Sequence, residues 1–455
     1  MPLILPSNSI SAGGYEVDNS LRFDDGSSDR LNYSVSSTTN TYTWTFSTWI
    51  KRANLGISDG LLIGQEIDGS NFDFIRFNSS DRLFYLGRYS GVDYRKETNR
   101  VFRDPSAWYH IVVARNGSSV NIYVNGVQET SFLTDNTFPS STGKFNTSGS
   151  DIAIGGRTAN VNYLPAYFSE TVWIDGSQLD PTSFGEFDED TGIWKPIDVS
   201  GLTFGTNGFY LDFENSGSLG ADVSGNGNNF TVNNLTSIDQ TTDTPTNNFA
   251  TLNPLDPSPN AITFSEGNLK ATGTSGDSGR STFGTFALSQ GKWWCEIKVT
   301  VGTTYPLIGI IDSSSSRKRA TYFADSDSGT NQSGFGVLAN DDIYHNGSIV
   351  DTWVTFSTGD IIGLGLDMDA SPPTLTFKKN NGDEKTINTE VPNSGFYNFP
   401  AIGLYYSSAV VEVNFGNPSY SISSGNADAN GYGNFEHAPK SGYYSCCSKN
   451  LAEFG

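Results

Sequence analysis

Carboxylates are the residues of this chain best suited to catalysis. Glycoside hydrolysis needs two acids that flank the scissile bond, and a Glu-x-Asp-x-x-Glu run on one strand is one way to supply them. The nearest match is 185–191, GEFDEDT, which has Thr191 where the second glutamate belongs. Because the segment is polar and loop-like, it predicts a solvated acidic turn, and we expect no enzymatic activity.

Histidines offer no second route to catalysis. His110 falls within a predicted strand, His345 at a turn and His437 in the C-terminal tail. No serine or cysteine stands in an elbow motif, so the sequence does not support a catalytic triad.

Oxygen ligands for a hard cation occur near both ends of the first half of the chain. Asp24 or Asp25 near its start and Asp222 with Asn226 near its end would meet if the first and last strands lie together. Calcium prefers such ligands, so a calcium site is one hypothesis, and no other cofactor is expected. The alternative is that Asp222 and Asn226 shape a glycine-rich turn.

Tyrosine and arginine are concentrated between residues 81 and 100. These side chains supply contact area and hydrogen bonds at recognition surfaces. The alternative is an outer sheet face that the other domain covers. The candidate binding residues are Tyr85, Arg88, Tyr89, Tyr94 and Arg95.

A second candidate surface is the compact basic cluster formed by Arg317, Lys318 and Arg319 with Tyr322, in an otherwise acidic chain. A contact to a neighbouring subunit or to an acidic glycan would use it. An ordinary solvated loop is the alternative.

Residues 359–383, GDIIGLGLDMDASPPTLTFKKNNGD, combine glycines, aspartates and an Asn-Gly pair. Ile362, Leu364 and Leu366 recur at every second position, which predicts a strand with one buried face. No helix follows the glycines to direct its N-terminus at a phosphate. The segment therefore predicts a hairpin and not a nucleotide-binding loop.

The elements that position these residues are predicted to be strands. Residues 108–128 give three short strands separated by Asn116-Gly117 and Asn125-Gly126, a strong hairpin signal. Asp180 followed by Pro181 predicts one short helix. The 49 glycines and the aromatic share of 13% also favour many short strands over helices.

Three segments lack sustained periodicity. Residues 1–19 and 417–455 are expected to be arms that order only against a partner, and residues 233–259 an extended linker. Cys446 and Cys447 fall in the second arm and are expected to be reduced, with a vicinal disulfide or an intersubunit contact as alternatives. Cys295 alternates with apolar residues, which predicts a core thiol.

Charge and hydropathy exclude several classes of function. The 27 basic residues against 49 acidic ones give a net charge of −22, which disfavours nucleic-acid and anionic-membrane partners. No apolar run approaches the roughly 20 residues that span a bilayer. The opening MPLILPSNSISAGG has no basic residue before its short apolar run, so we expect no signal peptide and synthesis in a cytosol.

Two sets of motifs carry a family resemblance. One set, in its order and spacing, resembles a SPRY domain, which implies a bent β-sandwich that binds partners through loops: GKWWCEIKV (291–299), GDIIGLGLDMD, TLTFKKNNG, FPAIGL (399–404) and VEVNFG (411–416). The other resembles a laminin-G or concanavalin-A-like jelly roll: LRFDDGSSDRLNY (21–33), WTFSTWIKR (44–52), WYHIVVARNG (108–117), VNIYVNG (120–126) and DVSGNGNNFT (222–231).

A third resemblance concerns the ends and the linker. PSNSISAGGYEVDNSLRF, DTPTNNFATLNP (243–254) and SKNLAEFG (448–455) are similar to segments of virion proteins of marine tailed bacteriophages. This resemblance implies a tail-fibre, spike or capsid-decoration protein that assembles in the host cytoplasm and reaches the virion surface. Its expected partners are other virion proteins and a host-surface glycan, and a homo-oligomer remains open.

The sequence thus predicts an all-β protein of two antiparallel β-sandwiches with extended terminal arms. The predicted order is an N-terminal arm (1–19), a concanavalin-like jelly roll (20–232), a linker (233–259), a SPRY-like sandwich (260–416) and a C-terminal arm (417–455). A non-enzymatic virion protein is the favoured function. A carbohydrate-binding lectin or adhesin and, behind it, a glycan-cleaving enzyme are the alternatives.

Overall fold

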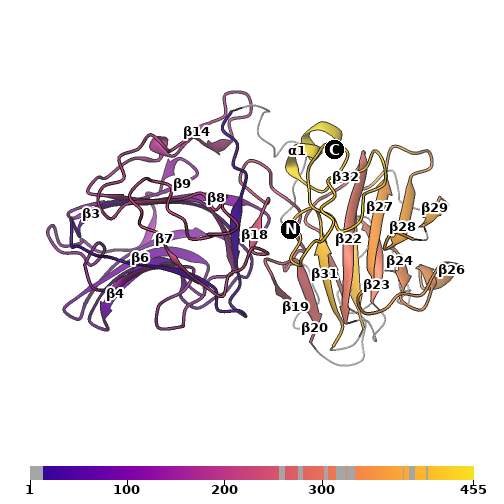
Figure 1. The fold of residues 1–455 in the computed structure, drawn as a ribbon, viewed down its shortest axis with the longest axis horizontal. Helices are drawn as coiled ribbons and strands as arrows, with labels where there is room; N and C mark the ends of the chain where they lie inside the picture. The colour runs from indigo at the N-terminus through magenta and orange to yellow at the C-terminus, as the bar shows by residue number, and fades with distance from the viewer. Residues whose placement is uncertain are drawn as a thin grey trace. The chain divides into compact units, whose positions relative to one another are not determined.

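The computed structural model describes residues 14–255, 262–274, 280–301, 306–313, 324, 334–382, 384–388, 395–405 and 408–455. The chain divides into two units between Thr246 and Asn247. Each unit is built from two large β-sheets whose pairings are antiparallel but for one short parallel strand (Figure 1). The predicted all-β class is confirmed, with 47% strand and 3% helix.

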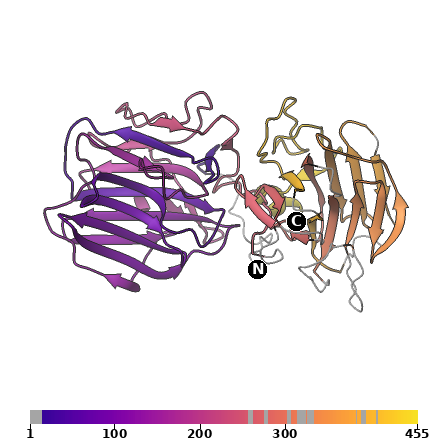
Figure 2. The ribbon, with the colours of Figure 1, turned by 90° about the horizontal axis from the view of Figure 1, so that it is seen from below.

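The first unit is a sandwich of two sheets, called sheet A and sheet B here (Figures 1 and 2). Sheet A has the order β10 (Val127–Gln128), β9 (Ser119–Val124), β8 (Trp108–Asn116), β3 (Thr43–Arg52), β13 (Ala166–Asp175), β1 (Ser20–Phe23) and β18 (Gln240–Thr241), and β16 (Phe209–Leu211) also pairs with β13. Sheet B has the order β11 (Phe132–Asp135), β7 (Val92–Val101), β6 (Arg82–Tyr89), β5 (Asn71–Phe77), β4 (Gly60–Asp68), β12 (Asp151–Ile154), β2 (Arg30–Ser34) and β17 (Thr231–Asn233).

Alternating apolar side chains from both sheets fill the core of this sandwich. Trp44 and Trp173 stack there with ring centroids 4.9 Å apart. The outer face of sheet A is covered by a later segment, because Phe184, Val199 and Phe204 pack against its apolar residues. That segment holds β14 (Gly185–Phe187), β15 (Trp194–Pro196) and the short helix η2 (Pro181–Ser183).

The local predictions for this unit are confirmed. The β8–β9–β10 meander turns at the two Asn-Gly pairs, as the sequence indicated. Asp180 caps η2 by accepting a hydrogen bond from the Thr182 backbone at 3.0 Å, with Pro181 in the first helical turn. Both features depend on neighbouring residues alone, which is why they are readable from the sequence.

The second unit also contains two sheets, called sheet C and sheet D here. Sheet C has the order β19 (Ile262–Ser265), β20 (Lys270–Gly273), β31 (Val410–Asn414), β22 (Lys292–Val301), β27 (Ile361–Asp367), β28 (Thr374–Lys379) and β29 (Glu384–Ile387), and β32 (Tyr444–Ser445) runs parallel to β22. Sheet D has the order β21 (Arg280–Phe283), β30 (Asn398–Leu404), β23 (Leu307–Asp312), β24 (Phe335–Leu338), β25 (Asp342–His345) and β26 (Ser348–Thr352).

The hairpin predicted within 359–383 is confirmed as β27 and β28. Leu364 lies opposite Phe377 and Leu366 opposite Leu375, so these four side chains enter one core. Cys295 is buried in the same core as a free thiol, as predicted.

The C-terminal arm is a correction to the sequence-based prediction. Residues after 416 were expected to order only against a partner, yet they fold onto sheet C of their own unit. Phe435 and Tyr443 pack on Trp294, and the chain ends in α1 (Ser448–Phe454), whose Leu451 is fully buried. Cys446 and Cys447 are free thiols buried in this segment and not exposed in a polar tail.

Glu296 explains how a polar segment is held on this sheet. Its buried carboxylate accepts hydrogen bonds from the backbone N–H groups of Glu436 (2.9 Å) and His437 (2.7 Å) and from the Asn414 side chain (3.3 Å). These contacts are specific but aperiodic, so no alternation marks the segment as buried.

The predicted linker is also not a free connection, because part of it packs on the first unit. Thr241 pairs with Ser20 of sheet A, and Asp243 forms a 2.7 Å ion pair with the buried Lys51. Phe249 and Leu252, a few residues later, are buried in the second unit. The linker residues are therefore shared between the two units.

Part of the N-terminal arm packs on the first unit as well. The Tyr15 hydroxyl donates to Glu170 at 3.1 Å, and the Val17 backbone donates to Thr246 at 3.1 Å. Residues 1–13 of this arm lie outside the described residues. In the portion of the chain with described structure, no helix has the length and apolar character needed to cross a bilayer.

Candidate functional site

Tyr85 and Tyr89 are not available for recognition, which corrects the predicted binding surface. Both lie inside the first sandwich, where their hydroxyl groups donate to Asp73 Oδ1 at 2.9 and 2.7 Å. Arg115 donates to both hydroxyls from the other side, at 2.8 and 2.7 Å. The four side chains form a buried polar network.

The remaining residues of that surface divide between the two faces of sheet B. Tyr94 faces inward and stacks on Tyr89 with ring centroids 5.4 Å apart. Arg88 precedes the inward-facing Tyr89, and Arg95 follows the inward-facing Tyr94. Because neighbouring residues of a strand point to opposite faces, both arginines lie on the outer face of sheet B. These two arginines are half-buried, with side chains 35% and 33% exposed, and each is paired with a carboxylate of the same sheet. Arg317, Lys318, Arg319 and Tyr322 lie outside the described residues.

Asp222 and Asn226 lie in one turn, which agrees with the alternative prediction that they shape a glycine-rich turn. Asp222 accepts hydrogen bonds from the backbone N–H groups of Tyr210 (3.0 Å), Ser224 (2.9 Å) and Asn228 (2.8 Å). The Asn226 amide donates to two backbone carbonyl groups at 2.7 and 2.9 Å. These polar groups hold the loop in shape.

Asp24 belongs to a different, acidic turn. Its Oδ1 accepts from the Gly26 backbone and its own N–H donates to Asp29 Oδ2, both at 2.9 Å. Burial raises the pKa of Asp29 to about 6, and burial followed by the neighbouring Asp24 raises the pKa of Asp25. In the part of the chain that the structure describes, no group of three or more His, Cys, Asp or Glu side chains is arranged to hold a metal ion.

The acidic run 185–191 was predicted to be a solvated turn, and the structure corrects this in part: residues 185–187 form β14, and the turn that follows has a buried aspartate. Asp188 is buried and accepts from the Thr191 backbone (2.9 Å) and hydroxyl (2.8 Å), while Lys195 lies 3.2 Å away. The carboxylate thus closes a hairpin loop.

His110 is likewise structural. It is enclosed beside Trp49 and Trp194, and the Trp194 indole donates to its Nδ1 at 2.9 Å. Burial lowers the pKa of His110 to about 3, so the ring is neutral near pH 7.

A shallow depression on the outer face of sheet B is the candidate site for a ligand. Its floor is made by two small residues, Gly64 of β4 and Ala153 of β12, which face each other across the strands. The Phe74 ring on β5 leans over Gly64 so closely that a Cβ there would overlap it. The depression is shallow and open to solvent, and its lining encloses no space that would hold a water molecule, unlike the roughly 300–1,000 Å³ pockets that take drug-sized ligands.

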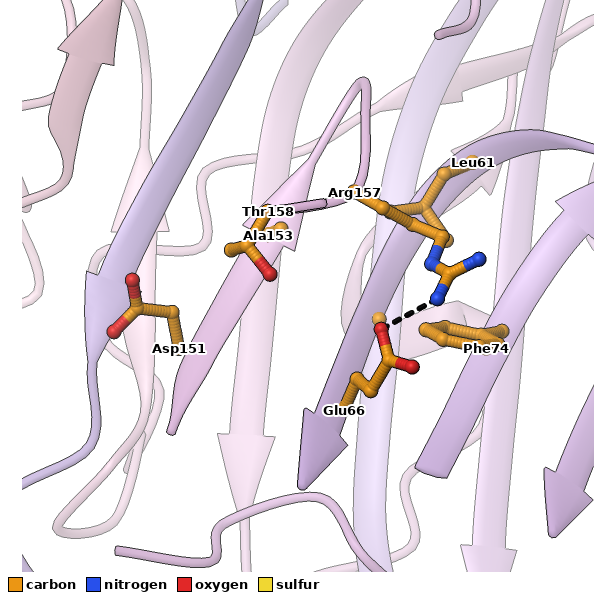
Figure 3. Close-up of a pocket in the computed structure, with 8 residues that line it drawn as sticks. Leu61, Glu66, Phe74, Asp151, Ala153, Arg157 and Thr158 are labelled. Carbon is orange, nitrogen blue, oxygen red and sulfur yellow. Dashed lines mark hydrogen bonds and ion pairs between the residues drawn. The ribbon is translucent and has the colours of Figure 1, made fainter. Parts of the chain in front are cut away.

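Polar side chains surround this depression (Figure 3). Arg157 follows β12 and forms a 2.5 Å ion pair with Glu66 of β4 beside the Phe74 ring. Asp151 accepts hydrogen bonds from Asn32 (2.9 Å) and Ser34 (2.5 Å), and Thr158 completes the lining. Carboxylate acceptors, a guanidinium donor and a hydroxyl group next to an aromatic ring suit a small, hydroxyl-rich ligand.

The sequence carries only weak signals for this depression. Gly64 and Ala153 are small residues in unremarkable strands, and Arg157 lies about ninety positions from its partner Glu66. Only the pairing of β12 with β4 brings them together. An isolated glycine within a strand pattern was the one usable hint, since it marks a site of close approach.

Two family models match the chain. Residues 25–177 match the concanavalin A-like lectin/glucanases superfamily, and residues 292–418 match the SPRY domain. No curated protein matches the chain.

Several solved structures are similar to parts of it. The SPRY domain of human HERC1 is 20% identical, with 36% of this chain and 96% of that chain covered and a TM-score of 0.29. The SAP-like pentraxin from Limulus polyphemus is 13% identical, with 36% and 78% covered and a TM-score of 0.28. The mouse laminin alpha1 chain domains LG4-5 are 11% identical, with 89% and 91% covered and a TM-score of 0.32. The first unit thus contains a concanavalin A-like jelly roll, and the second a SPRY-like β-sandwich.

Proposed function

We propose that this chain is a non-enzymatic adhesion protein of a bacteriophage virion surface, which holds a glycan in the depression on sheet B and attaches to other virion proteins. Tail fibre, spike and capsid decoration are the positions that suit such a protein. The observation that carries the glycan part of the proposal is the depression itself, with Gly64 and Ala153 as its floor and Glu66 and Arg157 at its rim.

The chemistry of the depression favours binding over cleavage. Glu66 is paired with Arg157, and Asp151 accepts two side-chain hydrogen bonds, so both carboxylates are engaged as acceptors. Acceptors of this kind hold sugar hydroxyl groups, whereas the Phe74 ring is almost fully buried and offers no apolar surface. Incubation with polysaccharides, scored for new reducing ends, should show no cleavage; sustained release of reducing ends would favour the glycan-cleaving alternative.

Filling the depression tests the site directly. Ala153→Tyr would place a ring over the floor, and we expect it to abolish binding on a glycan array that the wild-type chain recognises. Thr231→Tyr is the matched control, because Thr231 is exposed on the same face at the edge strand β17. Equal glycan binding by Ala153→Tyr and the wild type would show that the depression is not the glycan-binding site.

The virion placement is supported by the resemblance of the linker and end segments to virion proteins. The strong negative charge suits it too, since like charges keep particles apart. Mass spectrometry and immunogold labelling of purified virions should find the chain on the particle. If the chain is absent from particles but binds glycans, the alternative of a free lectin or adhesin replaces the virion assignment.

A further inference from the structure

The outer face of sheet B carries arginine side chains stacked on phenylalanine rings. The Arg76 and Arg157 guanidinium groups lie 3.8 and 5.0 Å from the centre of the Phe74 ring. Arg95 lies 4.0 Å from the centre of Phe84, which is the strand partner of Arg76. These five residues are called the arginine ladder here.

Arg76 is the unusual member of the ladder. The residue is 6% exposed, yet its guanidinium forms no hydrogen bond within the described structure; Arg95 and Arg157 also have an Nε without a hydrogen-bond partner, but each has a carboxylate within 2.8 Å. The one ion-pair partner of Arg76 is Asp59, at 3.9 Å, a side chain that is 45% exposed. A buried cation with so little compensation is costly, because desolvation is offset only by close, hydrogen-bonded counter-charge.

The neighbours of Arg76 increase this cost. Burial lowers the pKa of Arg76 to about 10, and the positive charges of Arg157 and Arg95 add to the shift, against Asp59 and Glu66. By contrast, Arg157 has Glu66 at 2.5 Å and Arg95 has Glu97 at 2.8 Å. An added anion at Arg76 would therefore supply the counter-charge that the protein leaves out.

We propose that Arg76, between Arg95 and Arg157, is a subsite for a carboxylate or sulfate group of an anionic polysaccharide whose neighbouring sugar lies over the shallow depression. The inference rests on the proposed glycan-binding function and names the chemical class of the glycan. Phe74 connects the two places, because it lines the depression and supports both Arg76 and Arg157. The planar guanidinium presents parallel N–H groups that match carboxylate or sulfate oxygens.

The test compares a sulfated dextran, a polyuronate and neutral dextran as ligands for the full-length chain at physiological salt. We expect the two anionic polymers to bind and Arg76→Met to weaken that binding at least tenfold. Arg100→Met is the matched control, because it removes the same charge from an arginine of the same unit whose side chain is 47% exposed and paired with Glu129. This control should change binding less than twofold.

Two further measurements test whether the Arg76→Met variant is folded and whether the ligand is specific. Arg76→Met should unfold at the wild-type temperature or above it, since the guanidinium gives up no hydrogen bond. Equal weakening by both variants, or equal binding of neutral dextran, would overturn the anionic subsite while leaving glycan binding intact. Arg76-dependent binding of duplex DNA or of an acidic peptide in place of the polysaccharides would also overturn it. Failure of every polysaccharide to bind would overturn both this inference and the proposed function.

Discussion

Arg115 shows how single residues hold the first unit together. It is fully buried, and its charge is balanced by Asp73 through the hydroxyl groups of Tyr85 and Tyr89. Arg115→Met would leave Asp73 buried without a cation. We expect a loss of about 3–5 kcal/mol in the free energy of unfolding, measured in urea.

The control for this prediction is Arg88→Met, which breaks an ion pair with Asp93 in which both side chains are at least one-third exposed, and should cost less than about 1 kcal/mol. A loss below about 1 kcal/mol for Arg115→Met would show that the network contributes little to stability.

Glu296 makes the stability of the second unit depend on pH. Burial raises the pKa of this carboxyl from 4.5 to about 7, although three hydrogen-bond donors lower it in part. Between these values the folded chain keeps a proton that the unfolded chain releases, so stability falls as pH rises through the window. This group alone should make the unit up to about 3 kcal/mol more stable at pH 5 than at pH 8.

Glu296→Gln should flatten that dependence, as followed by hydrogen exchange at the backbone N–H groups of Glu436 and His437. Glu453→Gln, which changes an exposed carboxylate of the same unit, should leave the wild-type profile unchanged. If the stability of Glu296→Gln depends on pH as that of the wild type does, Glu296 is not the group responsible.

Burial of individual residues was only partly predictable. In β6, Tyr85 and Tyr89 alternate with Phe84 and Arg88, so both faces carry aromatic or long side chains and the pattern does not say which one faces the core. The decisive partner, Asp73, lies on another strand. No local signal identifies it.

Local turn chemistry and alternation explain which strands and hairpins could be predicted from the sequence. Asn-Gly pairs set the β8–β9–β10 meander, and alternation set the β27–β28 hairpin. The C-terminal segment escaped prediction because it binds through scattered contacts to a surface formed by distant strands.

Gly363 of β27 leaves room for the Trp294 ring on the face of sheet C that the C-terminal segment covers. A Cβ at this position would overlap the Trp294 ring, on which Phe435 and Tyr443 pack. We expect Gly363→Ala to cost about 1–3 kcal/mol of stability and to speed proteolysis after residue 416, because Trp294 must move.

The matched variant is Gly382→Ala in the next turn of the same sheet. The nearest atom to a Cβ there is the Lys379 carbonyl oxygen at 3.4 Å, so we expect almost no effect. Equal behaviour of the two variants in thermal unfolding and limited proteolysis would contradict the packing argument.

At the scale of the whole molecule, the boundary between the units was predicted too early. The jelly roll was expected to end at residue 232, whereas the first unit continues to Thr246 and includes Asp243, the partner of Lys51. Composition misled here, because a polar, proline-containing stretch is typical of linkers but can also bind by specific polar contacts.

Asp243→Asn in the full-length chain tests this boundary. Lys51 would remain buried without its counter-charge, and the Trp108 indole would keep only an amide acceptor, so we expect a loss of about 3 kcal/mol in the first unit. Asp135→Asn, which weakens an exposed ion pair with Lys96, serves as the control and should cost less than about 1 kcal/mol. If both variants lose similarly little free energy of unfolding, residues 233–246 are a linker and not part of the first unit.

The central claim is that the outer face of sheet B holds an anionic glycan. Arginine-specific labelling with phenylglyoxal, read by mass spectrometry with and without saturating sulfated dextran, measures it most directly. We expect Arg95 and Arg157 to be protected, while Arg100 and Arg103, with side chains 47% and 59% exposed, stay reactive. Equal labelling of all four arginines with and without the polymer, or protection confined to Arg100 and Arg103, would contradict it.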